Sequence, residues 1–214
     1  MISAGFEHRD FAYEGRYGLR EAQTVQLLGG PCTARMYQLA WEAAELLHVA
    51  PPMVAAVIEA ESGCRGEAVS SAGARGLMQL IPEYGGREAY RYLHGRDRQP
   101  TQADLHDPRI NIQLGVSYIG ALQGHYYFVN SQLARGVLAV AAYNCGPDAV
   151  DRRLPFKRAQ TWDASEAMEW VLGNTPAETR NYVGTVLRKA SIYDRAIKAM
   201  HMSSERQVRT LALP

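Results

Sequence analysis

Apolar residues recur every three or four positions along much of this chain, the spacing that gathers side chains on one face of a helix. The clearest run begins after Thr33, which can cap the helix. Its apolar positions are Met36, Leu39, Ala40, Ala43, Leu46 and Leu47. No stretch shows the alternation of apolar and polar residues that is typical of a half-buried strand. The pattern therefore predicts a mainly α fold.

Prolines mark the boundaries of the next segments. Pro51 suits the first turn of a helix that runs to Glu61 and stops at Ser62-Gly63. A short helical piece is expected at residues 76–81, because Pro82 would end it. Residues 84–106 are rich in Gly, Arg and Tyr and are expected to form a loop with room for one short helix.

Capping residues predict three later helices. Asp107-Pro108 starts one, Ser131 caps another over residues 132–144, and Thr175 opens a third that runs to about Met200. Residues 148–173 are less regular and are expected to form a partly helical insertion.

The charge balance and hydropathy exclude two classes of partner. The formal net charge is +1, so the chain offers no bulk electrostatic attraction for nucleic acid. No stretch approaches the ~18 consecutive apolar residues of a membrane span. The start of the chain, Met1 to Arg20, lacks the apolar core of a signal peptide. The chain is then cytosolic, or a mature form without its leader, or exported by another route.

Three cysteines, Cys32, Cys64 and Cys145, lack the spacing of metal ligands. They fit either three small buried residues or one disulfide with a free thiol. No metal or organic cofactor is implied.

Glu61 is the first candidate for chemistry. The apolar stripe of its helix is formed by Val54, Val57 and Ile58, and position 61 falls on the same stripe, whereas Glu59 should point toward solvent. Burial and the carbonyl end of the helix would both raise the pKa of Glu61, as a general acid requires. The alternative is a partly exposed glutamate at a helix end.

Four segments, taken in order, resemble the SLT domain of lytic transglycosylases, a family with a goose-type-lysozyme-like α fold and a substrate groove. They cover roughly residues 50–189. The segments are Glu61-Ser62-Gly63, Gly76-Leu77-Met78-Gln79-Leu80-Ile81-Pro82, Ala142-Tyr143-Asn144-Cys145-Gly146-Pro147 and Glu178-Thr179-Arg180-Asn181-Tyr182-Val183.

The resemblance implies cleavage of the β-1,4 bond between N-acetylmuramic acid and N-acetylglucosamine in peptidoglycan without water. Glu61 would protonate the leaving oxygen and then take the proton of the muramic 6-hydroxyl, which closes a 1,6-anhydro ring. This scheme belongs with the substrate-assisted exceptions to two-carboxylate glycosidases.

The resemblance also supplies candidate substrate-binding residues. Gln79 matches an amide that binds a sugar or peptide group, and Tyr143 matches a tyrosine that contacts the glutamate and the N-acetyl group. Ser70 is either a hydroxyl near the glutamate or an ordinary loop serine. Glu178 either completes a capping box with Thr175 or supports the cleft. The remaining candidates in the matching segments are Ile81, Asn144 and Tyr182.

Two departures from the family pattern are Cys64 and Cys145. If the family geometry holds, both flank the site and could bridge, which would favour an oxidising location such as the periplasm or cell envelope. The resemblance assigns residues 33–200 to the lysozyme-like catalytic domain, with an arm or accessory segment at 1–32 and a tail at 201–214.

Three functions remain open at this stage. The first is a lytic transglycosylase that remodels the cell wall, with a secretion or conjugation apparatus as a candidate partner. The second is a hydrolytic muramidase of the goose-lysozyme type. The third is a non-catalytic glycan-binding or assembly protein.

Overall fold

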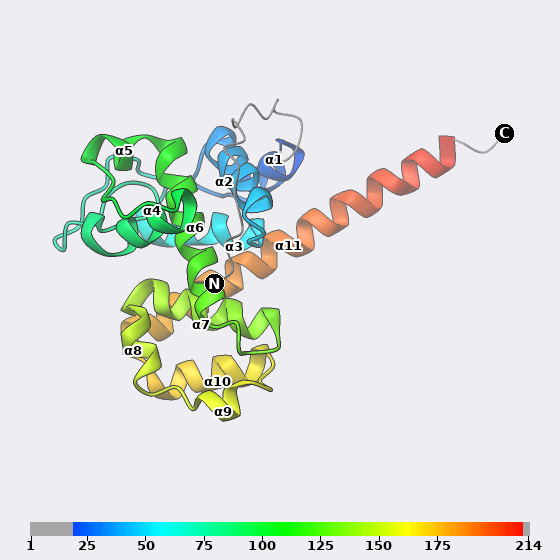
Figure 1. Cartoon of the computed structure of the whole chain (residues 1–214). Helices are drawn as coiled ribbons and strands as arrows, with labels where there is room; N and C mark the ends of the chain where they lie inside the picture. The colour runs from blue at the N-terminus through cyan, green and yellow to red at the C-terminus, as the bar shows by residue number, and fades with distance from the viewer. Residues whose placement is uncertain (1–18, 212–214) are drawn as a thin grey trace.

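The computed structural model describes residues 19–211, with side chains placed from 20 to 203. This part of the chain is mainly helical, without a strand, which confirms the predicted α fold (Figure 1). The long helices are α2 (Ala34–Leu46), α3 (Pro51–Ser62), α6 (Pro108–His125), α7 (Gln132–Cys145), α10 (Ala164–Asn174) and α11 (Ala177–Leu211). The short ones are α1 (Leu19–Leu27), the π-helix η1 (Pro82–Gly86), α4 (Arg87–His94), α5 (Gln102–His106), α8 (Pro147–Asp151) and α9 (Phe156–Ala159).

Helices α3 and α7 form the centre of the core. Helix α3 packs between α2 and α11, and α7 packs against α6, α10 and α11. Residues 53–59 of α3 and 136–142 of α7 are all buried. Helix α11 runs along the domain beyond α3 and its last turns project from the body of the molecule (Figure 1).

Three of the four helix starts predicted from capping residues are confirmed by hydrogen bonds. The side chain of Thr33 accepts from the backbone of Met36, and that of Ser131 accepts from Ala134. Asp107 caps α6 in the same way. Because these signals are local, the sequence carries them without knowledge of the fold.

Several boundaries differ from the prediction. Residues 76–81 form turns and an isolated bridge between Arg75 and Leu80, not a helix, and Pro82 starts η1 where it was expected to end a helix. Residues 84–106 contain α4 and α5 as well, and α11 continues past Met200 to Leu211. Of the arm predicted at 1–32, residues 1–18 lie outside the described part, as do 212–214 of the predicted tail.

The predicted bridge between Cys64 and Cys145 is wrong. Cys64 pairs with Cys32, with a Cα–Cα distance of 5.1 Å, and Cys145 is free. Gly63 in the left-handed conformation ends α3, and Cys64 just beyond it lies against the segment that precedes α2. The thiol of Cys145 lies instead over the last turn of α7, where it contacts the carbonyl oxygen of Ala141.

Within residues 19–211, no helix has both the length and the apolar character needed to cross a bilayer.

Candidate functional site

Glu61 lies in the last turn of α3, immediately before the helix ends. Gly63 has φ 57° and its backbone N–H donates to the carbonyl oxygen of Glu59, which closes the helix at this point. A left-handed C-cap strongly favours glycine. The end of α3 is therefore fixed by sequence, and it presents Glu61 to the neighbouring helices α7 and α11.

The carboxyl group of Glu61 is partly buried and has an unusual proton affinity. Its pKa is raised to about 7, chiefly by burial; a hydrogen bond from Tyr182 opposes the shift, and the negative charge of Glu178 adds to it. The hydroxyl of Tyr182 donates to Oε1 of Glu61 at 2.6 Å. At neutral pH this carboxyl group is thus divided between its protonated and ionised forms, so it can both donate and accept a proton.

Tyr143 lies beside the same carboxyl group but has another hydrogen-bond partner. Its hydroxyl donates to the carbonyl oxygen of Met78 at 2.7 Å. Burial, followed by the charge of Glu61, raises the pKa of Tyr143 well above its usual value, and the same two influences raise that of Tyr182. Both phenols therefore stay protonated beside Glu61, one as its donor and one as a link to the loop that follows α3.

That loop is held in shape by its own polar groups. Gln79 adopts φ 45° and its side-chain amide donates to the carbonyl oxygens of Ala68 and Gly76 at 3.1 and 2.9 Å. The hydroxyl of Ser70 accepts from the backbone of Ala74 at 3.0 Å. The N–H groups of Gln79 are thus used within the loop, and its carbonyl oxygen is the group that remains to receive a donor.

Asn111 supports the loop from α6, and the sequence analysis missed it. This fully buried side chain accepts from the backbone of Met78 at 2.8 Å and donates to the carbonyl oxygens of Arg75 and Leu105. Gly76 has φ 77°, and a Cβ at this position would lie 2.3 Å from the Asn111 amide nitrogen. An asparagine in the first turn of an otherwise amphipathic helix was the only available signal.

The other candidate residues lie around this centre. Asn144, at the end of α7, accepts from the hydroxyl of Thr179 at 2.7 Å, which ties α7 to the start of α11. Glu178 is exposed one residue earlier, close enough to raise the pKa of Glu61. Ile81 is partly buried and its carbonyl oxygen accepts from Tyr84 and Gly86 in η1.

Thr175, the fourth predicted capping residue, lies at the end of α10, two residues before α11 begins. The hydroxyl of Thr175 donates to the carbonyl oxygen of Val171 in the last turns of α10.

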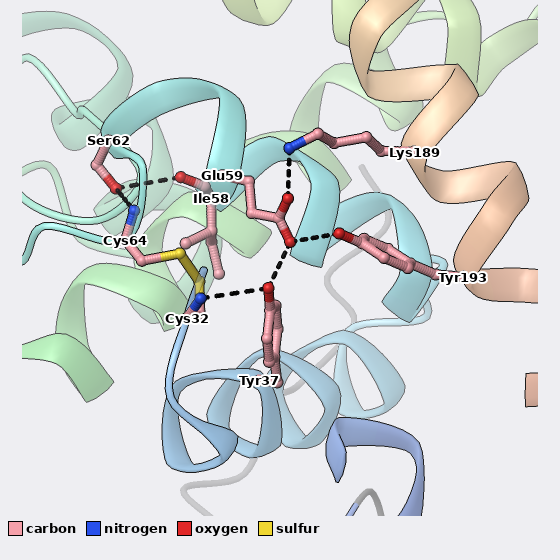
Figure 2. A network of polar contacts seen from close by, with 8 residues as sticks. All are labelled: Cys32, Tyr37, Ile58, Glu59, Ser62, Cys64, Lys189 and Tyr193. Carbon is pink, nitrogen blue, oxygen red and sulfur yellow. Dashed lines mark hydrogen bonds and ion pairs between the residues drawn. A yellow bond between two sulfur atoms is a disulfide. The ribbon is translucent and has the colours of Figure 1, made fainter. Parts of the chain in front are cut away.

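The prediction that Glu59 points to solvent is wrong. Only 6% of this residue is exposed, and its carboxylate is surrounded by Tyr37, Lys189 and Tyr193 (Figure 2). Helix α3 has no solvent face over residues 53–59, because α2 covers one side and α11 another. A polar residue in such a helix must meet polar partners inside the protein.

Among residues with described side chains, no group of three or more His, Cys, Asp or Glu is placed to hold a metal ion.

The transglycosylase SLT domain profile matches residues 38–164, more than half of the chain. The chain belongs to the transglycosylase SLT domain family. It is 32% identical over 143 residues to the endo-type membrane-bound lytic murein transglycosylase A of Citrobacter koseri, covering 64% of this chain and 70% of that protein. It is also 32% identical to the membrane-bound lytic murein transglycosylase C of Haemophilus ducreyi, over 66% of this chain but only 40% of that longer protein.

Solved structures agree with this assignment. An inactive glutamate-to-glutamine mutant of the lytic transglycosylase Slt from Pseudomonas aeruginosa is similar at 29% identity, with a TM-score of 0.60 over 75% of this chain and 24% of that one. The 70 kDa soluble lytic transglycosylase of Escherichia coli shares the fold, with a TM-score of 0.56 at 22% identity, over 85% of this chain and 29% of that one. Both solved proteins are thus several times longer than the matched region.

Proposed function

We propose that this protein is a peptidoglycan lytic transglycosylase with Glu61 as its acid and then its base. The observation that carries the proposal is the Glu61 carboxyl group itself, with a pKa of about 7 and the hydroxyl of Tyr182 at 2.6 Å. One group that must give and then recover a proton works best when its pKa lies near the operating pH. Family membership supplies the substrate class, the glycan strand of the cell wall.

The proposed reaction conserves every atom of the glycan. Protonated Glu61 donates its proton to the bridging oxygen, and the bond from that oxygen to the muramic C1 breaks. The N-acetyl group of the substrate stabilises the cationic C1. The muramic 6-hydroxyl oxygen then bonds to C1, and its proton passes to the Glu61 carboxylate. The products are a 1,6-anhydro-muramic end and a new free 4-hydroxyl, with no water consumed.

We assign substrate binding to side chains around Glu61. Tyr143 and Tyr182 exclude water from the carboxyl group and keep neutral phenols next to it. The free carbonyl oxygen of Gln79 is the acceptor for a sugar or peptide N–H, because its N–H groups are occupied. The remaining proposed contacts come from Ser70, Ile81, Asn144 and Glu178.

Digestion of purified peptidoglycan tests the proposal directly. We expect products that are one water lighter than those of a hydrolase, as read by mass spectrometry of the muropeptides. The matched variant Glu61→Gln should fold and bind glycan but release product at a rate lower by about 10²–10⁴-fold. Products of the hydrolytic mass would assign the protein to the muramidases instead, and a Glu61→Gln variant as active as wild type would remove Glu61 from its role.

The proposed location is the periplasm or cell envelope. The Cys32–Cys64 disulfide supports an oxidising compartment. A secretion or conjugation apparatus is the proposed partner, and co-purification from the envelope would test it. We retain the division into an accessory segment at 1–32, a catalytic domain at 33–200 and a tail at 201–214, which limited proteolysis would test.

A further inference from the structure

Glu59 carries a buried carboxylate that the proposed reaction does not use. Its side chain is 1% exposed and accepts three hydrogen bonds. The hydroxyl of Tyr37 donates at 2.5 Å, that of Tyr193 at 2.6 Å and the ammonium of Lys189 at 2.5 Å (Figure 2). Burial, then the hydrogen bond to Glu59, raises the pKa of both tyrosines, so both remain donors. A charge held by this many partners fixes the position of the backbone that carries it.

The same helix pair is joined a second time at Glu61. Tyr182 and Lys189 are seven residues apart on α11, which places them on one face two turns apart. Tyr193 continues that face one turn further. Helices α3 and α11 therefore meet at two polar sites: Glu59 accepts from Lys189 and Tyr193, and Glu61 accepts from Tyr182. A shift of α11 along α3 would disturb both.

The other side of α3 is fixed through α2 and the disulfide. Besides donating to Glu59, the hydroxyl of Tyr37 accepts from the backbone of Cys32 at 3.4 Å. Cys32 is bonded to Cys64, and the hydroxyl of Ser62 both donates to Ile58 and accepts from the backbone of Cys64. Figure 2 shows the resulting chain of contacts from Lys189 through Glu59 to the residues that follow Glu61.

We propose that Glu59 is a positioning residue, which holds α3 and α11 in the register that keeps the Tyr182 hydroxyl on the Glu61 carboxyl group. The assignment of a catalytic consequence rests on the proposed function of Glu61. The positional claim itself does not, because it concerns a contact between two side chains of the folded protein.

The direction of change in the Glu61 pKa separates positioning from a direct charge effect. The groups that face Glu61 are Tyr182 and Glu178 from α11 and Tyr143 from α7. The Tyr182 hydrogen bond lowers the pKa of Glu61, so its loss would raise it. Direct removal of the negative charge of Glu59 would lower it. The two explanations predict opposite signs.

The test measures the pKa of Glu61 in the full chain that carries Glu59→Gln. Carboxyl-carbon NMR of protein labelled in its glutamates reports the titration. Glu61→Gln identifies the resonance. We expect Glu59→Gln and Tyr182→Phe each to raise the pKa of Glu61, and the double variant to match Tyr182→Phe alone. A lowered or unchanged pKa in a folded Glu59→Gln protein overturns the proposal, as does a double variant whose shift is the sum of the two.

Two further variants keep the proposal testable if Glu59→Gln does not fold. Tyr193→Phe removes one donor and leaves the Lys189 pair, so it should raise the pKa of Glu61 by less than Glu59→Gln does; an unchanged value contradicts the proposal. The matched control is Glu42→Gln on α2. Its side chain is 13% exposed and lies within 4.0 Å of Arg35 and 3.8 Å of Arg109. It should leave the pKa of Glu61 unchanged.

The kinetic readout follows from the same shift. Because the first step needs protonated Glu61, kcat/KM for product release should fall as pH rises through the pKa of Glu61. In Glu59→Gln this fall should occur at higher pH, and kcat should be several-fold lower. If the wild-type protein releases no anhydro product, the proposed function fails while the NMR test of Glu59 still stands. If wild type is active and its fall with pH is unmoved in Glu59→Gln, the proposal fails alone.

Discussion

Two glutamates in the last turns of α3 have opposite surroundings. Glu59 is the more buried, and it accepts hydrogen bonds from a cation and two phenols. The pKa of Glu61 is raised to about 7, chiefly by burial, because one hydrogen bond from Tyr182 only partly opposes the shift and the negative charge of Glu178 adds to it. The comparison shows that two carboxyl groups on one helix can differ more in their partners than in their depth.

Activity gives the largest contrast between the two positions. Glu61→Gln should lower the rate of anhydro-muropeptide release by about 10²–10⁴-fold, the range for loss of a general acid or base. Glu59→Gln keeps the reacting group and should stay within about 10-fold of wild type, the rate effect of roughly 1.4 kcal/mol. Rates on purified glycan strands at fixed pH measure both. Equal losses in the two variants would erase the functional distinction.

Stability should show the reverse contrast. Glu59→Ala leaves Lys189 and two phenols without their acceptor, and we expect it to lower the free energy of unfolding by about 3 kcal/mol, reduced from the fully buried case because Lys189 is 36% exposed. Urea denaturation measures the change. Glu61→Gln serves as the control, since it should not destabilise the protein at neutral pH.

The Cys32–Cys64 disulfide, like Glu59, is expected to contribute to the free energy of unfolding. Replacing Cys32 and Cys64 by serine releases a link across 32 residues and should lower the free energy of unfolding by about 3 kcal/mol. Thermal denaturation with and without reductant checks it, and reductant should have no further effect on the double variant. Cys145→Ser, at the free thiol, should leave the reductant sensitivity of the protein as it is.

The smallest effect is the pH dependence that Glu61 imposes on stability. Its pKa is about 7 in the folded protein and 4.5 as the reference value, so the folded state binds the proton more tightly. Stability is then highest below the reference pKa and falls as pH rises through the folded pKa, by about 1–3 kcal/mol. Denaturation between pH 4 and pH 8 should show less of this decline in Glu61→Gln. An identical pH profile in both proteins would mean that Glu61 titrates normally.

The helices and the placement of Glu61 on a buried stripe could be predicted because their signals are local. Thr33, Asp107 and Ser131 each cap the helix that follows them, and Gly63 ends α3 before any tertiary contact is considered. The same local reasoning identified Glu61 by its spacing from Val57 and Ile58.

The errors at Glu59, Cys64 and Asn111 concern contacts between distant parts of the chain. Glu59 was assigned to solvent because the sequence does not show that α11 lies over it, and its partner Lys189 is 130 residues away. The disulfide partner of Cys64 was misassigned for the same reason. Asn111 supports a loop 33 residues earlier, and an asparagine in the first turn of a helix does not by itself show which loop it supports.

The pairing of Glu59 with Lys189 also limits how the protein can diverge. A change at one position alone leaves an uncompensated charge in the interior, whereas two apolar residues of similar volume can replace the whole pair. Positions 59 and 189 are therefore expected to covary, so that homologues lacking the acid also lack the base.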